Sequence, residues 1–288
     1  MDFAVSSYSF ANAHIDELDL PKKAKEMGFD AIEFAEIHPG NMDKKEYAKL
    51  LREKCDEANI RISNYAIGAD FINGCGGYFN DEVERLFHEI DIAEILGVHL
   101  VRHDCTVGYQ YDYMYERQQI GFQQALKWII VGCTQVTEYA ESKNIRTMIE
   151  NHGRFCQEST RLEQIVTGVA NENFGLLLDM GNFLCADENP IEAFGRLAPF
   201  VFYVHAKDFH VKSGNGVRPQ NGFFTTRGGN FLRGAIIGHG EVPILQCLRI
   251  LRENKYDSWV SVEFEGMEDP ITGISCGFEN LKYLDSLD

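Results

Sequence analysis

Short apolar runs alternate along the chain with longer amphipathic stretches. The apolar runs lie near residues 3–7, 30–34, 60–65, 98–102, 145–149, 174–178, 200–204 and 259–264. Stretches with 3.6-residue apolar spacing occupy about 18–28, 43–58, 80–97, 116–143, 158–171, 189–198, 241–254 and 276–286. Such runs are typical of parallel strands buried on both faces, and the spacing is typical of helices. The pattern predicts an α/β fold, a (β/α)8 TIM barrel formed as one domain by residues 1–288.

Four of the apolar runs carry a potential metal ligand at or near their end. IRTMIE ends at Glu150, FGLLLD at Asp179, FVFYVH at His205, and WVSVEF carries Glu263. Active-site residues of parallel barrels lie at the carboxyl ends of the strands, so these four side chains are expected to meet at one end of the barrel. Two Glu, one Asp and one His form an oxygen-rich set that suits Mn2+, with Mg2+, Co2+ or Zn2+ as alternatives.

Composition narrows the classes of partner. Asp and Glu number 44 against 27 Lys and Arg, which gives a net charge of −17 and disfavours binding to nucleic acid. No stretch approaches the ~20 apolar residues that a membrane span needs. The eight cysteines are spread singly, and the N-terminal residues lack the pattern of a secretory leader. These features predict a cytoplasmic protein with reduced thiols, without a nucleic-acid or membrane partner.

Two regions after strands are candidates for the rim of a site. The segment 206–240 is predicted to be a long loop, and it is the most cationic part of the chain. It is interpreted as a lid over an anionic or polyhydroxy substrate, or as a surface loop that neutralises nearby carboxylates. Tyrosines suggest an aromatic wall near the mouth, or a hydrophobic helix start: Tyr65, Tyr109, Tyr111, Tyr113 and Tyr115.

The sequences around the four ligands, IENHG (149–153), LDMGN (178–182), VHAKDFH (204–210) and SVEFEG (261–266), carry a family resemblance. The chain resembles the xylose isomerase-like TIM barrel superfamily, in particular its sugar isomerase and epimerase branch. That resemblance implies that Glu150, Asp179, His205 and Glu263 bind one divalent metal. It also implies that the two glutamates move a proton on the substrate carbon, and that a small-molecule sugar is the substrate and a homo-oligomer the assembly.

Further polar residues stand close to these strand ends. His152 is either a general base or a capping histidine that supports the ligands. Lys207 either pairs with Asp208 at the surface or holds a substrate oxygen. Many epimerases of the branch have a His three residues after the Asp ligand, where this chain has Asn182, so a proton-transfer role there is lost. The residues predicted to bind substrate are Arg102, His103, Asn182, Lys207 and His239.

These features predict a metal-dependent isomerase or epimerase that acts on a ketose or keto-sugar derivative through proton abstraction and an enediolate. The alternative is a lyase of the same superfamily, a keto-inositol dehydratase or an enzyme that cleaves C-glycosides of 3-keto sugars by elimination. An acid such as His152 or His239 over a leaving group would favour it. A three-zinc DNA-repair endonuclease is disfavoured by the charge and by Ile67 and Ala69 at the third strand end.

Overall fold

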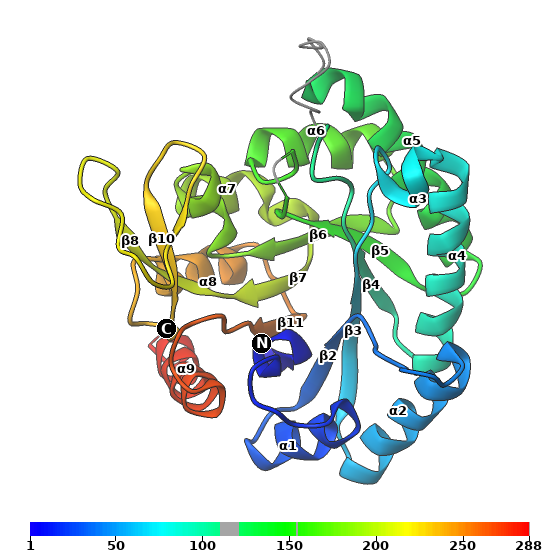
Figure 1. Ribbon diagram of the computed structural model, residues 1–288, viewed down its shortest axis with the longest axis horizontal. Helices are drawn as coiled ribbons and strands as arrows, with labels where there is room; N and C mark the ends of the chain where they lie inside the picture. Colours follow the sequence, from blue (N-terminus) through cyan, green and yellow to red (C-terminus); the bar gives the residue numbers. More distant parts are fainter. Residues whose placement is uncertain (110–120, 154, 288) are drawn as a thin grey trace.

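The structure, a computed structural model, describes residues 1–109, 121–153 and 155–287. Within them, eight parallel strands close into a barrel (Figure 1). Around the barrel the order is β1 (Asp2–Ser6), β11 (Trp259–Val262), β7 (Val201–Ala206), β6 (Phe174–Asp179), β5 (Arg146–Glu150), β4 (Leu100–His103), β3 (Arg61–Ile67) and β2 (Ala31–Ala35). The predicted (β/α)8 TIM barrel is confirmed, and each predicted strand has its counterpart.

Helices follow the strands and cover the outside of the barrel (Figure 1). They are α1 (Leu20–Glu26), α2 (Lys44–Ala58), α4 (Phe79–Leu96), α5 (Phe122–Glu141), α6 (Ser159–Val169), α7 (Pro190–Leu197), α8 (Ile244–Glu253) and α9 (Pro270–Asp285), with a short kinked α3 (Gly74–Gly77) before α4. The helix expected at 276–286 begins six residues earlier, because Asp269 caps the amide of Thr272 and Pro270 suits the first turn. The expected start of the helix at 116 lies outside the described residues.

The described residues form an apolar core on each face of the barrel strands. The larger one fills the space between strands and helices, and a smaller one inside the barrel contains Met148, Leu177 and Tyr203, all fully buried. Successive side chains of a strand point to opposite faces. The residues two positions after these three therefore also point into the barrel, but nearer to its carboxyl end. They are Glu150, Asp179 and His205, so the interior packing fixes the direction of three predicted ligands.

The segment predicted as a long loop is ordered differently from that expectation. It contains a small antiparallel sheet of order β8-β10-β9, made of β8 (Asp208–Lys212), β9 (Phe224–Thr225) and β10 (Phe231–Ala235). β8 continues the chain directly from β7 beyond the barrel (Figure 1). The turn before β10 is held by Asp187, whose carboxylate accepts hydrogen bonds from Thr226 Oγ1, the amide of Gly228 and Asn230 Nδ2.

Among the described residues, no helix combines the length and the apolar content that crossing a membrane requires.

Candidate metal centre

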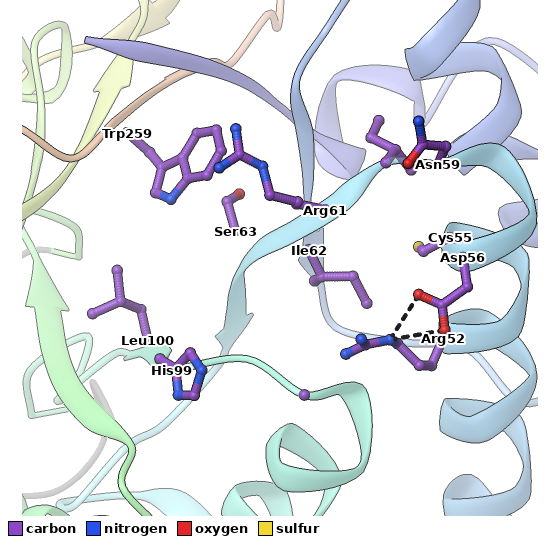
Figure 2. Close-up of a pocket in the computed structure, with 12 residues that line it drawn as sticks. Arg52, Cys55, Asp56, Asn59, Arg61, Ile62, Ser63, His99, Leu100 and Trp259 are labelled. Carbon is purple, nitrogen blue, oxygen red and sulfur yellow. Dashed lines mark hydrogen bonds and ion pairs between the residues drawn. The ribbon is translucent and has the colours of Figure 1, made fainter.

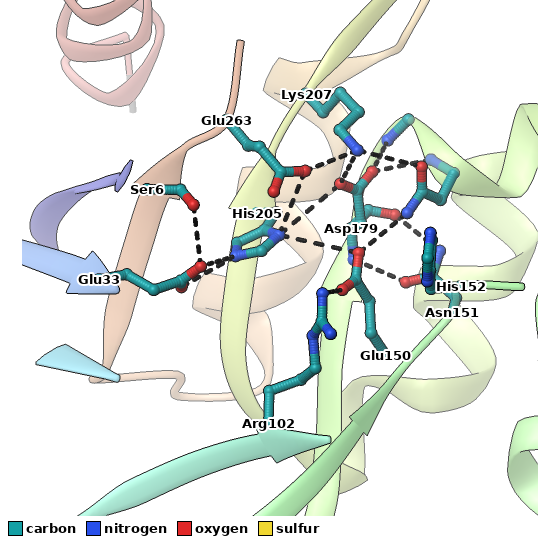
Figure 3. Close-up of polar contacts among 12 residues, drawn as sticks. Ser6, Glu33, Arg102, Glu150, Asn151, His152, Asp179, His205, Lys207 and Glu263 are labelled. Atoms are coloured by element: carbon teal, nitrogen blue, oxygen red, sulfur yellow. Dashed lines mark hydrogen bonds and ion pairs between the residues drawn. The ribbon is translucent and has the colours of Figure 1, made fainter. Parts of the chain in front are cut away.

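Four buried ligand groups meet at the carboxyl end of the barrel. Glu150, Asp179, His205 and Glu263 each offer one ligand atom, and these atoms all lie within 4.8 Å of one another (Figure 3). Atoms on opposite sides of a divalent ion are about 4–5 Å apart, since metal–ligand distances are about 2.0–2.4 Å. The spacing of the four groups therefore fits one ion.

His205 is oriented by a residue that sequence reasoning missed. Its Nε2 lies 3.0 and 2.9 Å from the two carboxylate oxygens of Glu33 on β2. The other nitrogen, Nδ1, faces Glu263 Oε2 at 3.5 Å and carboxylate oxygens of Glu150 and Asp179 at 3.8 Å. This buried Nδ1 has no hydrogen-bond partner among the described residues. A buried nitrogen without a partner and three carboxylates face one another, and a cation between them would bind all four groups. The residues therefore fit a metal.

Asp179 is fixed by its neighbours so that one oxygen remains for the cluster. Its amide and carbonyl exchange hydrogen bonds with the side chain of Asn151, at 2.7 and 2.8 Å. Its Oδ1 accepts from the amides of Gly181 and Asn182. Oδ2 is left facing His205 and Lys207. Asn151 was not predicted, although its place directly after Glu150 in IENHG was a signal.

Asn182 and Lys207 lie within the cluster. Asn182 Nδ2 donates to Glu150 Oε1 at 2.9 Å, and its Oδ1 lies 3.3 Å from Lys207 Nζ. Lys207 Nζ is 2.6 Å from Glu263 Oε2 and 3.2 Å from Asp179 Oδ2 (Figure 3). The lysine does not form the surface pair with Asp208 that was the alternative, because Asp208 accepts backbone amides, including those of Gly238, Gly240 and Val242.

The charges of the cluster shift its pKa values in opposite directions. Burial alone would raise the pKa of Glu263, but Lys207 and His205 hold it well below its ordinary value. Burial raises the pKa of Asp179 to about 7, against the opposing effect of Lys207 and with the help of the two glutamates. The carboxylates are thus unequal, and a cation would favour the ionised form of each.

A second chain of contacts leads from Glu150 to His152 through two residues of the fourth strand end. Arg102 Nη2 lies 2.7 Å from Glu150 Oε2, and Arg102 Nη1 lies 3.4 Å from Asp104 Oδ1. The same Asp104 oxygen lies 3.1 Å from His152 Nδ1, and this hydrogen bond raises the pKa of His152. The side chain of His152 is half exposed.

Other predicted site residues lie away from the cluster. The ring of His103 packs against Phe71 and Phe174, and its Nδ1 contacts the carbonyl of Asp104, so it is directed into the outer core. His239 is exposed in the turn after β10, and no hydrogen bond or ion pair joins it to the cluster in the described part of the chain.

The structure also differs from the prediction of an aromatic wall and bears on the prediction of a cationic lid. Tyr65 is buried and donates to Glu89, so it faces the helices and that part of the wall is wrong. Tyr109 packs edge-on against Phe155, whereas Tyr111, Tyr113 and Tyr115 lie outside the described residues. Arg227 and Arg233 pair with Glu158 and Glu268, as expected if the segment neutralises neighbouring carboxylates.

A surface cavity of about 450 Å³ lies at the opposite end of the barrel (Figure 2). Its lining includes Arg61, Leu100 and Trp259, the first residues of β3, β4 and β11, and the Arg61 guanidinium stacks on the Trp259 ring at 4.4 Å. Because the four ligand groups stand at strand carboxyl ends, this cavity is separate from the metal centre.

Curated relatives match about half of the chain. An inosose dehydratase of Clostridium beijerinckii is 26% identical over 151 residues, which are 51% of this chain and 49% of that protein. The chain spans about half the length of this curated relative, so the comparison by itself transfers no activity.

Solved structures match the fold over nearly the whole chain. A D-psicose 3-epimerase from Clostridium cellulolyticum H10, solved with D-tagatose, has a TM-score of 0.75 at 14% identity and covers 99% of both chains. The IOLI protein, solved with a bound zinc atom, has a TM-score of 0.75 at 20% identity and covers 99% of this chain and 98% of its own. The xylose isomerase-like TIM barrel family model matches residues 21–284. With its closed eight-stranded barrel, this chain belongs to the xylose isomerase-like TIM barrel family.

Proposed function

We propose that this protein is a divalent-metal-dependent isomerase or epimerase that acts on a ketose or keto-sugar derivative. The observation that carries the proposal is the buried cluster, in which two glutamates, an aspartate and a histidine bring their ligand atoms within 4.8 Å. Glu150, Asp179, His205 and Glu263 would hold the ion. The oxygen-rich set favours Mn2+, with Mg2+, Co2+ and Zn2+ as alternatives.

The reaction begins with removal of a proton from the carbon next to the substrate carbonyl. A divalent cation polarises a carbonyl and an adjacent hydroxyl, and so acidifies the C–H bond between them. Glu150 and Glu263 come from different strands and supply two carboxylates at the reacting carbon. One takes the proton to give an enediolate, and the other returns a proton to the opposite face or to the neighbouring carbon.

Neighbouring side chains set the charge and orientation of this pair. Arg102 and Asn182 each contact one oxygen of Glu150, which limits the rotation of its carboxylate. Lys207 is close enough to both Glu263 and Asp179 to contact a substrate oxygen on which negative charge develops. We assign Arg102, Asn182 and Lys207 to substrate binding. We leave His103 and His239 out because of where their rings lie.

Dehydration is the second candidate, and it shares the first step. The curated relative is an inosose dehydratase, and His152 stands beside the cluster with Asp104 as its partner. A protonated His152 could give its proton to a departing hydroxyl, so that the enediolate collapses with loss of water.

The cytoplasmic location and a homo-oligomeric assembly stay predictions.

NMR in D2O separates the two outcomes. The protein is loaded with Mg2+ and incubated with ketoses, ketose phosphates, keto-inositols and 3-keto glycosides. Entry of deuterium next to the carbonyl, with an epimer or isomer appearing, supports the proposal. The appearance of a dehydrated product or of a free aglycone, with no epimer, supports the lyase. A protein that holds its metal and exchanges no proton on any of these substrates contradicts the proposed function.

A further inference from the structure

Glu33 is a fully buried carboxylate with no place in the proposed chemistry. It lies in the short strand AIEFA and points into the barrel, where an isolated ionised group is costly to bury. Both of its oxygens approach His205 Nε2, at 2.9 and 3.0 Å. Figure 3 shows it on the side of the imidazole away from the carboxylates of Glu150, Asp179 and Glu263.

The strands on either side hold the carboxylate in place. Ser6 Oγ on β1 donates to Glu33 Oε1 at 3.1 Å, and Asn64 Nδ2 on β3 donates to Oε2 at 3.2 Å. A register shift between β2 and β3 makes this possible, since Ile32 pairs with Ile62 whereas Glu33 pairs with Asn64. The irregularity brings an amide donor on β3 opposite Glu33.

Two distinct nitrogens give the imidazole a direction. A carboxylate at Nε2 favours a proton on that nitrogen, so Nδ1 is the nitrogen that would give up its proton and offer its lone pair when a cation binds. Nδ1 is the atom that faces Glu263, Glu150 and Asp179 and has no hydrogen-bond partner in the described structure. The hydrogen bond therefore fixes both the rotation of the ring and the nitrogen that is available to a cation.

We propose that Glu33 is the positioning residue of the metal centre: it holds His205 as the Nε2–H tautomer with Nδ1 directed at the ion, and thereby sets metal affinity. This inference rests on the metal site of the proposed function. It assigns Glu33 no contact with substrate and no ligand role.

The test measures binding of Mn2+ alone by isothermal titration calorimetry, independently of turnover. We expect Glu33→Ala to weaken Mn2+ binding about 10- to 100-fold, as loss of such partners does in other metal sites. Glu33→Gln keeps the size and one acceptor oxygen but places an amide NH2 beside the donor groups, so an intermediate loss of about 10-fold is expected. Ser63→Ala is the matched control. Ser63 is buried next to Asn64, but its hydroxyl bonds to Ile32 O and Tyr203 OH, so affinity should stay within about twofold.

A spectroscopic readout separates positioning from general stability. In the Mg2+-loaded protein with 15N-labelled histidine, His205 should show a protonated Nε2 and an unprotonated Nδ1, and this signature should be lost in Glu33→Ala. If that variant does not fold, Glu33→Gln carries the test. A folded Glu33 variant that binds Mn2+ within twofold of the wild type overturns the inference while leaving the metal site intact. Failure of the wild-type protein to bind Mn2+ overturns the metal site and the inference together.

Discussion

Replacing Glu150 by glutamine tests the proposed chemistry with little change in shape. In the wild type, Glu150 Oε1 accepts from Asn182 Nδ2 at 2.9 Å and Oε2 lies 2.7 Å from Arg102 Nη2. Glutamine removes the charge and places an NH2 group against one of these donors. It therefore removes a carboxylate that is a proposed base and a proposed metal ligand.

The cost to folding should be moderate because Arg102 keeps other partners. Asp104 Oδ1 remains 3.4 Å from its guanidinium and the carbonyl of Ile67 remains 3.2 Å away. Leaving a buried charge without any partner costs about 3–5 kcal/mol, so we expect a smaller loss of about 1–3 kcal/mol. Domains are typically stable by about 5–15 kcal/mol, so the variant should fold. Removing a general base lowers turnover about 10²- to 10⁴-fold.

The assay compares deuterium entry and product formation by NMR for the two proteins, at a Mg2+ concentration that saturates each. Circular dichroism melts verify that Glu150→Gln is folded, and titration verifies that it holds the ion. A folded, metal-loaded variant with turnover within twofold of the wild type would refute the role of Glu150 as base.

Three other outcomes are expected. Mn2+ at about 100 times its Kd should stabilise the protein by about 2.7 kcal/mol and raise Tm by about 4–5 °C, and an unchanged melt at millimolar Mn2+ would contradict the metal site. Burial lowers the pKa of His103 to about 4 from 6.5, so its contribution to stability is present above pH 6.5 and is lost as the pH falls towards 4. Urea titrations should show about 2 kcal/mol of this loss between pH 7 and pH 5, and His103→Gln should lack it; equal pH slopes would argue against a neutral buried ring. Asp187→Ala removes the acceptor of Thr226 and Asn230, so amide hydrogen exchange in β9 and β10 should quicken while Mn2+ affinity stays unchanged, and protected amides there would contradict the assigned anchor.

The ligand residues at the strand ends were predictable because the same pattern recurs in several strands. A ligand-type residue that closes a largely apolar run stands out, and Glu150, Asp179 and His205 all follow this pattern. The barrel then places them together, since parallel strands finish at one rim. The family resemblance added the order of the ligands along the chain, and the family match confirms that resemblance.

The face of a strand to which a side chain points was harder to predict from the sequence than its position along the strand. Arg102 and His103 are adjacent at the end of β4, yet Arg102 reaches Glu150 whereas His103 packs against Phe71. Alternation puts neighbouring side chains on opposite faces, and only a residue of known direction tells which is which. Glu33 escaped notice because one polar residue in a five-residue strand gives no repeat, and its partner Asn64 depends on a register shift that no sequence pattern marked.

The small sheet was mistaken for a loop because its strands are short and their partners lie far along the chain. β8 has five residues and ends in the exposed Lys212, β9 has two residues, and turn residues such as Gly228 separate β9 from β10. The pairing of β10 with β8 joins residues about 20 positions apart, for example Arg233 with His210. Local spacing contains no information about such a pairing.

The packed interior at the amino end of the barrel limits how an ion and a substrate can reach the ligand groups. Met148, Leu177 and Tyr203 fill the interior below the ligands, with Leu100, Phe202 and Trp259 packed beneath them. Among the described residues, this packing leaves the carboxyl rim as the route to the buried ligand atoms. An ion held by the four groups and a substrate that reaches them would therefore use the same entrance. Metal should load first, and a resident substrate should slow metal exchange, so that chelators strip the ion faster from the substrate-free enzyme than from the working one.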